Sequence, residues 1–327
     1  MPKSRTRKRK ASQRKHKPAG SSLEIISDDL PPIFDRRSMD RTMSNLQRLL
    51  SQREFDSPTE MNNFLSQFNH LDNIPAPSNL TPLEQAQDVM YEAFEASGPK
   101  RIELSRRALE ISPDCADAWV LLAEEEARTP QKALEYYEKG VQAGERALGP
   151  QAFADNVGHF WAILETRPYM RARAGLAEVL WHLGKRQEAM AHYREMLRLN
   201  PNDNQGMRDL LIRCLLKVGD DQGVGELLDQ YKDSGMAEWL YTRALHTFRV
   251  QGDSPPARAA LQEALKQNRH VPPYLTGKKK QPPQLPPYMG FGDDHEAVHY
   301  VAHHFEFWLK TPGAQQWLLN NLGVKTR

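Results

Sequence analysis

The sequence predicts an all-α protein: a right-handed superhelical solenoid of tetratricopeptide-like helix hairpins, with a disordered basic N-terminal tail and a C-terminal capping helix pair. Two observations lead to this prediction. Helical periodicity with capping signals runs from Thr81 almost to the end of the chain. Within it, a 34-residue spacing relates helix ends, small residues and large apolar residues. The 39% hydrophobic content and mean hydropathy of −0.70 are typical of a soluble chain with polar segments.

The internal repeat is clearest in the second half of the chain. Helix-turn ends recur at this step, at Pro201, Gly235 and Arg269. The same step relates small residues near the start of each second helix, which are Ala189, Gly223 and Ala257. It also relates apolar residues of each first helix, which are Leu176, Leu210 and Ala244. Two earlier units fit more loosely. A helix pair cannot bury its apolar face alone, so small residues let its two helices approach while large ones fill the gap to the next pair. We therefore expect five stacked pairs that share one extended core.

The N-terminal region precedes this array. Residues 1–37 lack hydrophobic periodicity, so we expect them to be a disordered basic tail. Two short helical patterns follow within residues 38–70, the second opening with an N-cap signal at Ser57, and we expect a short helical hairpin there. Residues 71–80 form a proline-bearing linker.

The array itself is expected over residues 81–269, opening with a capping box at Thr81 and interrupted by an inserted helix near 152–164. Paired prolines in the next segment, 270–292, argue against regular helix, so this segment is expected to be extended. Residues 293–327 then supply the capping helices that close the open end of the stack.

The basic tail divides the chain electrostatically. Of the 44 Lys and Arg residues, nine lie in residues 1–20, which leaves 35 to balance 42 Asp and Glu. Such a tail could be a solvated segment that aids solubility, a weak nucleic-acid contact or a transport signal, and its charge does not decide among them. The residues that would contact nucleic acid are Lys3, Arg5, Arg7, Lys8, Arg9, Lys10, Arg14, Lys15 and Lys17.

Several protein classes are disfavoured by what the sequence lacks. Charged residues interrupt every apolar run before it reaches the length of a membrane-spanning helix. The basic start leads into no apolar signal region, so we expect a cytoplasmic protein without membrane contact. Two cysteines, Cys115 and Cys214, are too few for a disulfide framework and are expected to be buried.

One segment looks catalytic. His295-Glu296-Ala297-Val298-His299 matches H-E-x-x-H, the helical zinc motif of metalloproteases. For a third ligand only Glu306 remains as an acid downstream, and the longer metalloprotease pattern fails at Ala302 and Phe305. A solvated or partly buried histidine face is therefore favoured, with metal binding by the His295, His299 and His303 stripe as the alternative. The acidic run at 124–126 is interpreted as a solvated face. We expect no catalytic residue, no cofactor and no enzyme activity.

Binding residues are expected on the first helix of each unit, which lines the concave surface in this repeat class. Aromatic and arginine side chains often anchor interfaces, which makes Trp181, Arg208 and Trp239 the first candidates for a peptide groove, with core packing as the alternative for both tryptophans. The full candidate set is Glu124, Glu178, Trp181, His182, Arg208, Trp239, His246 and Arg249.

Four segments resemble a known family, the tetratricopeptide-like suppressor-of-tumorigenicity-seven family, in its bacterial-type branch. They are ISPDCADAWVLLAEEEA at 111–127, HFWAILETRPYMRARAGLA at 159–177, HYREMLRLNPNDNQG at 192–206 and PPYMGFGDDHEAVHY at 286–300. The resemblance implies a repeat-containing interaction protein without an assigned active site.

The sequence therefore leads to two functional hypotheses. The first is a non-catalytic scaffold or adaptor that binds a peptide or protein partner in the concave groove. The alternative is a nucleic-acid-associated accessory protein that uses the basic tail.

Overall fold

The computed structural model describes residues 37–51, 53–66 and 79–322, and this part of the chain is helical with no strand. The predicted basic tail lies almost wholly outside these residues. The α-helices are α1 (Arg37–Ser51), α2 (Pro58–Leu65), α3 (Pro82–Glu95), α4 (Pro99–Ile111), α5 (Ala116–Glu125), α6 (Pro130–Asp155), α7 (Arg167–His182), α8 (Arg186–Leu199), α9 (Met207–Val218), α10 (Asp221–Gln230), α11 (Ala237–Gln251), α12 (Pro255–Gln267), α13 (Val271–Leu275), α14 (Asp294–Lys310) and α15 (Ala314–Asn321). Two 3-10 turns, η2 (Phe160–Ala162) and η3 (Leu164–Thr166), precede α7.

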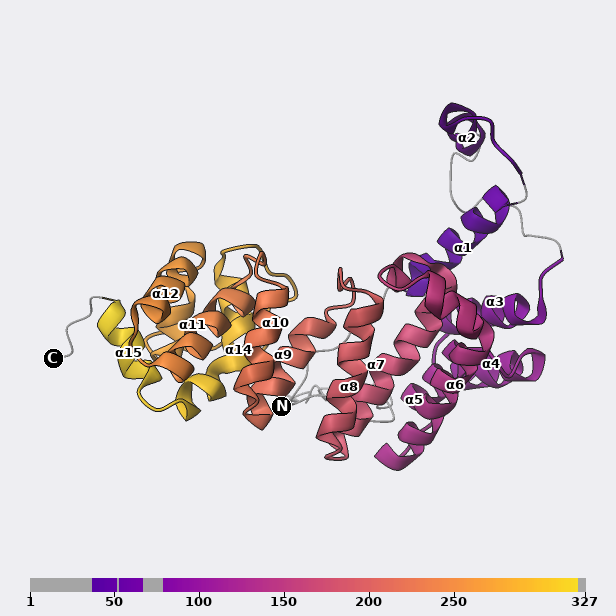
Figure 1. Cartoon of the computed structure of the whole chain (residues 1–327). Helices are drawn as coiled ribbons and strands as arrows, with labels where there is room; N and C mark the ends of the chain where they lie inside the picture. The colour runs from indigo at the N-terminus through magenta and orange to yellow at the C-terminus, as the bar shows by residue number, and fades with distance from the viewer. Residues whose placement is uncertain (1–36, 52, 67–78, 323–327) are drawn as a thin grey trace, which may run out of the picture.

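The helices from α3 to α12 pack as consecutive pairs. α3 contacts α4, α5 contacts α6, α7 contacts α8, α9 contacts α10, and α11 contacts α12. The pairs follow one another in an elongated row, with α15 at the end away from α3 and α4 (Figure 1). α14 packs on α9 and α11, so the C-terminal helices cover the last pairs of the row. None of the described helices combines the length and the apolar character needed to cross a bilayer.

Helix starts in this row follow the capping signals in the sequence. The Thr81 hydroxyl accepts from the Glu84 N–H, and the Glu84 carboxylate accepts from the Thr81 N–H, which is the predicted capping box. Ser57 likewise caps α2 and Asp293 caps α14 through side-chain oxygens. Local sequence therefore fixes where these helices begin.

The core occupies the space within and between the pairs. The three small residues spaced at the repeat step, Ala189, Gly223 and Ala257, are all buried in second helices. Their apolar counterparts in the first helices, Leu176 and Ala244 among them, are buried as well. Cys115 and Cys214 are both buried, as predicted.

Two segments differ from the sequence-based expectation. The helix expected near 152–164 is shorter, because residues 150–155 are helical after a break at Gly149 (φ 68°), and η2 and η3 follow. Within 270–292, the first proline pair starts α13 rather than preventing it, since Pro272 and Pro273 occupy its first turn, where no intrahelical N–H bond is lost.

Candidate functional site

The surface formed by the first helix of each pair, α3, α5, α7, α9 and α11, together with α14, is here called the first-helix face. The binding residues were predicted from the sequence to lie on this face. The structure divides those residues into core side chains and side chains that already have partners.

Both predicted tryptophan anchors are core residues. Trp181 is 1% exposed and Trp239 is 2% exposed. The Arg208 guanidinium lies over the Trp239 ring, 5.3 Å from its centroid, and also over Tyr231 at 4.9 Å. Core packing, which was the alternative to binding, is therefore the role of both tryptophans. Arg208 packs over the rings of Tyr231 and Trp239.

The remaining candidates lie nearer the surface. His246 is half-buried, with its Nε2 2.8 Å from the Asp221 carbonyl oxygen, and His182 is half-buried at the end of α7. Arg249 pairs with the Asp221 carboxylate at 2.9 Å. Glu178 is buried, and burial together with the nearby Glu124 charge raises its pKa to about 7.

Glu124 is bound by a segment of the same chain. Helix α1 lies against α3 and η3, and its Arg37 donates both guanidinium η nitrogens to Glu124 of α5, at 2.7 and 3.0 Å. Asp40 of α1 accepts from Arg171 at 2.7 Å and also pairs with Arg167, both on α7. Helix α1 thus occupies the N-terminal part of the first-helix face.

A buried charge cluster lies beneath α1. Asp117 is 0% exposed and accepts two bonds from Arg171, at 2.6 and 2.8 Å, and one from Gln87 at 2.8 Å. Burial would raise the Asp117 pKa, but the Arg171 charge and hydrogen bonds outweigh it, so this pKa is lowered. Arg171 therefore joins α1, α5 and α7 through two carboxylates.

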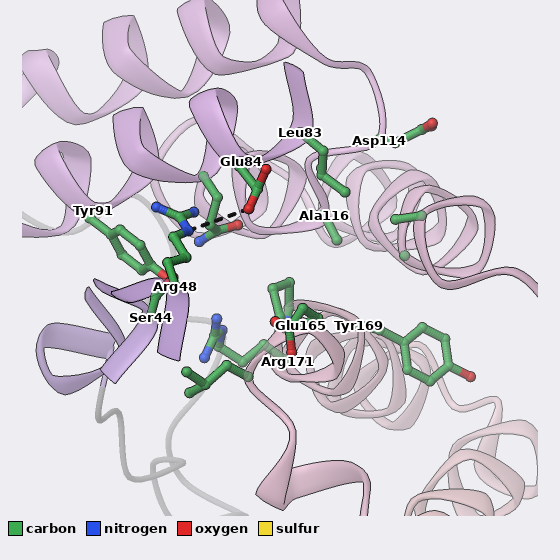
Figure 2. Close-up of a pocket in the computed structure, with 15 residues that line it drawn as sticks. Ser44, Arg48, Leu83, Glu84, Tyr91, Asp114, Ala116, Glu165, Tyr169 and Arg171 are labelled. Carbon is green, nitrogen blue, oxygen red and sulfur yellow. Dashed lines mark ion pairs between the residues drawn. The ribbon is translucent and has the colours of Figure 1, made fainter. Parts of the chain in front are cut away.

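A crevice of about 110 Å³ remains between α1 and the neighbouring helices, shown in Figure 2. Arg48 of α1 points across it toward Glu84 of α3, at 3.5 Å, and also pairs with Asp88 at 2.9 Å. Arg171 and Glu165 come from the opposite wall (Figure 2). Charged side chains thus hold α1 at both of its ends.

Sequence reasoning missed this arrangement, although one signal was present. Asp117 lies in α5 among apolar positions, between Ala116 and Ala118, where a carboxylate must find a partner. Nothing in the local sequence says that Arg171 and Asp40 supply the other charges.

Side chains of the H-E-x-x-H segment are hydrogen-bonded to other parts of the chain. Glu296 is 2% exposed, and its carboxylate accepts from the Ala237 and Gly292 N–H groups at 2.9 and 2.8 Å, and from the Asn268 and Gln267 amides. His299 Nε2 lies 2.9 Å from the Pro286 carbonyl oxygen. Within the described residues, no group of three His, Cys, Asp or Glu side chains is placed to hold a metal ion.

Comparison with known proteins identifies the family. The model of the family described as ST7 protein matches residues 77–322, which run from just before α3 to the end of α15. This chain belongs to the ST7 family. The matched range includes every helix pair of the row and starts after α1, so the helix on the first-helix face lies outside it.

Curated ST7 relatives come from several animals. Suppressor of tumorigenicity 7 protein-like from Gallus gallus is 29% identical over 256 residues, which is 71% of this chain and 46% of that protein. Protein ST7 homolog from Caenorhabditis elegans is 30% identical over 272 residues, 71% of this chain and 49% of that protein. The Drosophila melanogaster homolog is 28% identical over 260 residues. The chain thus spans about half the length of the ST7 proteins it matches.

Proposed function

We propose that this ST7-family chain is a non-catalytic scaffold or adaptor that binds a peptide or protein partner along the first-helix face. In this proposal the helix pairs form a tetratricopeptide-type, right-handed superhelix, the first-helix face is its concave groove, and the protein acts in the cytoplasm. The main support is the position of α1. A helical segment is already bound on that face through Arg37–Glu124 and Asp40–Arg171 pairs, which is the helix-in-groove mode of peptide recognition.

Two matched arginines can test which face binds. Arg249 lies on the first helix α11 and pairs with Asp221 at 2.9 Å, whereas Arg258 lies on the second helix α12 and pairs with Asp253 at 2.6 Å. The full-length chain, Arg249→Glu and Arg258→Glu would each be used for affinity capture from the cell's own lysate after nuclease treatment. We expect a discrete protein with the wild type and Arg258→Glu, and clearly less with Arg249→Glu. Equal capture by both variants would argue against the first-helix face.

A second candidate, a nucleic-acid-associated accessory protein, is supported by the nine basic residues of the first twenty. It predicts that capture disappears after nuclease treatment. It also predicts that binding of a DNA or RNA oligonucleotide falls steeply with salt and is lost when Lys8, Arg9 and Lys10 are replaced by Glu.

A further inference from the structure

Helix α1 is attached to the row by charged groups more than by buried apolar surface. Of its described side chains, Asp40 alone is buried, and the next helix, α2, has no buried side chain. Residues 52–81 separate α1 from α3 in the sequence. Ion pairs near a protein surface each contribute little stability, so we expect α1 to open more easily than the helix pairs beneath it.

The row provides a carboxylate-binding site under α1, formed by Arg167 and Arg171 of α7. Two nitrogens of Arg171 donate to Asp117, and its third, Nη1, donates to Asp40 of α1 at 2.7 Å. The Arg171 side chain is only 9% exposed, so losing the Asp40 bond would leave a nearly buried donor without its partner. Arg167 pairs with the same carboxylate. Without α1, two guanidinium groups would share Asp117 alone among these ion pairs, which favours a second carboxylate.

Beside it lies an arginine-binding site, formed by Glu124 of α5 and Phe94 of α3. Both η nitrogens of Arg37 donate to Glu124, at 2.7 and 3.0 Å, and the guanidinium carbon lies 5.0 Å from the Phe94 ring centroid. A carboxylate that accepts both nitrogens, together with an aromatic face, is a typical arrangement for recognising a guanidinium group. Burial and the Glu124 charge raise the pKa of the neighbouring Glu178, so the site favours a cation.

The spacing of the α1 charges matches these two sites. Arg37 and Asp40 are three positions apart, which places both on one side of the helix. Arg48 follows Arg37 by about three helical turns and pairs with Asp88 of α3 at 2.9 Å. Exchanging the first two charges would bring Arg against Arg171 and Asp against Glu124. The face therefore selects the order of the charges as well as their number.

On the C-terminal pairs, the acid of the first-helix face has its charged and polar neighbours within the row. Glu238 of α11 lies 3.6 Å from Arg213 of α9 and 3.3 Å from His304 of α14. Both neighbours belong to the residues matched by the ST7 model. The two N-terminal sites differ, because Arg37 and Asp40 come from α1, outside the matched range.

The fit of α1 to this face is also incomplete. The crevice of about 110 Å³ between α1 and its neighbours lies beside Arg48 and Arg171 (Figure 2). The two charged sites thus lie within the part of the chain shared with the family, while the helix that occupies them lies outside it and leaves space unfilled. A different helix with the same charge order could satisfy both sites.

We propose that α1 is an intramolecular competitor of a partner helix in which an arginine is followed three positions later by an aspartate or glutamate. The arginine of that helix binds Glu124 and Phe94, and its acid binds Arg167 and Arg171, after α1 has left the face. Resting on the peptide-binding function proposed above, this competition specifies the chemistry of the partner and the way in which access to the face is regulated.

The first test uses a labelled peptide with the sequence of residues 37–51, added to the full-length chain and followed by fluorescence anisotropy. We expect it to bind Asp40→Ala about tenfold or more tightly than the wild type, because the α1 of that variant competes less. Arg41→Ala, which removes an exposed pair with Glu95, should behave like the wild type. A peptide carrying Arg37→Asp and Asp40→Arg has the same composition and should bind Asp40→Ala about tenfold or more weakly.

A charge reversal distinguishes recognition from loss of folding. In the full-length Asp40→Ala chain, a further Glu124→Arg change should weaken the wild-type peptide about tenfold or more and strengthen a peptide with Arg37→Glu. The Glu124 side chain is 29% exposed, so the added arginine can reach solvent. A misfolded chain would bind neither peptide, and far-UV circular dichroism would detect it.

Affinity capture from the cell's own lysate then tests the partner. After nuclease treatment, we expect full-length Asp40→Ala to retain several times more of a discrete protein than the wild type or Arg41→Ala. The peptide of residues 37–51 should elute this protein, and the peptide with exchanged charges should not. The eluted protein should contain a helix with the predicted arginine and acid, and replacing that arginine by glutamate should abolish its capture.

The outcomes separate this competition from the proposed function. A protein captured equally by the wild type and Asp40→Ala, and not eluted by the peptide, would overturn the competition and leave the Arg249→Glu comparison to test the function. Peptide binding that ignores the charge order, or no peptide binding to Asp40→Ala, would also overturn it. No captured protein with any folded variant would overturn both.

Discussion

At the scale of single residues, the pKa values of buried carboxyl groups on the first-helix face are shifted in opposite directions. The Asp117 pKa is lowered because two guanidinium nitrogens of Arg171 outweigh the burial. The pKa of Glu178 and of Glu238 is raised, to about 7 and about 8, because burial is not offset by an equally close cation. The folded chain therefore favours the ionised form of Asp117 and the neutral form of Glu178 and Glu238.

Asp117→Ala should destabilise the chain by about 3–5 kcal/mol, because Arg171 would remain buried with one of its two carboxylates missing. Denaturant unfolding at pH 7 measures this change. The control is Asp114→Ala, three residues before Asp117, which removes a half-exposed ion pair with Arg146. It should change stability by less than about 1 kcal/mol. The Asp117 contribution should begin to decrease below the unfolded-state pKa of 3.8. Equal effects of the two variants would contradict the buried bridge.

Glu238→Gln should stabilise the chain at pH 8 by about 2 kcal/mol or more, because it removes an acid whose folded pKa is above its unfolded value. The unfolded chain ionises Glu238 above its ordinary pKa of 4.5, while the folded chain resists ionisation up to about 8. The destabilisation is thus absent below pH 4.5, grows as pH rises and is complete above about 8. Thermal unfolding of both proteins between pH 4.5 and 8.5 would show it, and a constant difference across that range would contradict it.

At the scale of elements, local chemistry sets the helix boundaries and long-range contacts set the rest. The capping box at Thr81 and the caps at Ser57 and Asp293 were predictable because each uses residues within one helical turn. The 34-residue spacing predicted the helix pairs because small residues such as Ala189 must face a neighbouring helix. The position of α1 was not predictable, since Asp40 meets its partner 131 positions later in the chain.

Close helix contact predicts a sharp effect at one glycine. A Cβ atom added at Gly175 of α7 would lie 2.1 Å from Tyr137 Cε1 of α6, and the Tyr137 ring is buried. Gly175→Ala should therefore lower stability by about 1–3 kcal/mol, although alanine favours helix. Gly225→Ala is the control, because its added Cβ approaches only the outer edge of His246. We expect it to be neutral or slightly stabilising in denaturant unfolding, and a loss as large as that at Gly175 would contradict the argument.

At the scale of the whole molecule, α1 determines how much of the first-helix face is open. Arg37, Asp40 and Arg48 fix it to the N-terminal pairs, while on the C-terminal pairs α14 packs against α9 and α11. In the function proposed above, a partner that binds the N-terminal part of this face must compete with α1.

Asp40→Ala should release α1 while leaving the rest of the row intact, because it removes both guanidinium contacts of this carboxylate. Hydrogen exchange measured by mass spectrometry should accelerate about tenfold or more within α1 and stay unchanged within α9 to α12. Arg41→Ala, which removes only an exposed pair with Glu95, serves as the control and should leave exchange in α1 nearly unchanged. Unaltered protection of α1 in Asp40→Ala would show that other contacts hold it.

The four bonds accepted by Glu296 also affect how the C-terminal end of the row unfolds. Linear arrays of helix pairs lose structure first at their ends, because a terminal pair has only one neighbour. Glu296 of α14 is bonded to the start of α11, the end of α12 and the segment before α14. The terminal pair and its cover must therefore open together, so α11, α12, α14 and α15 should melt as one cooperative block instead of fraying helix by helix.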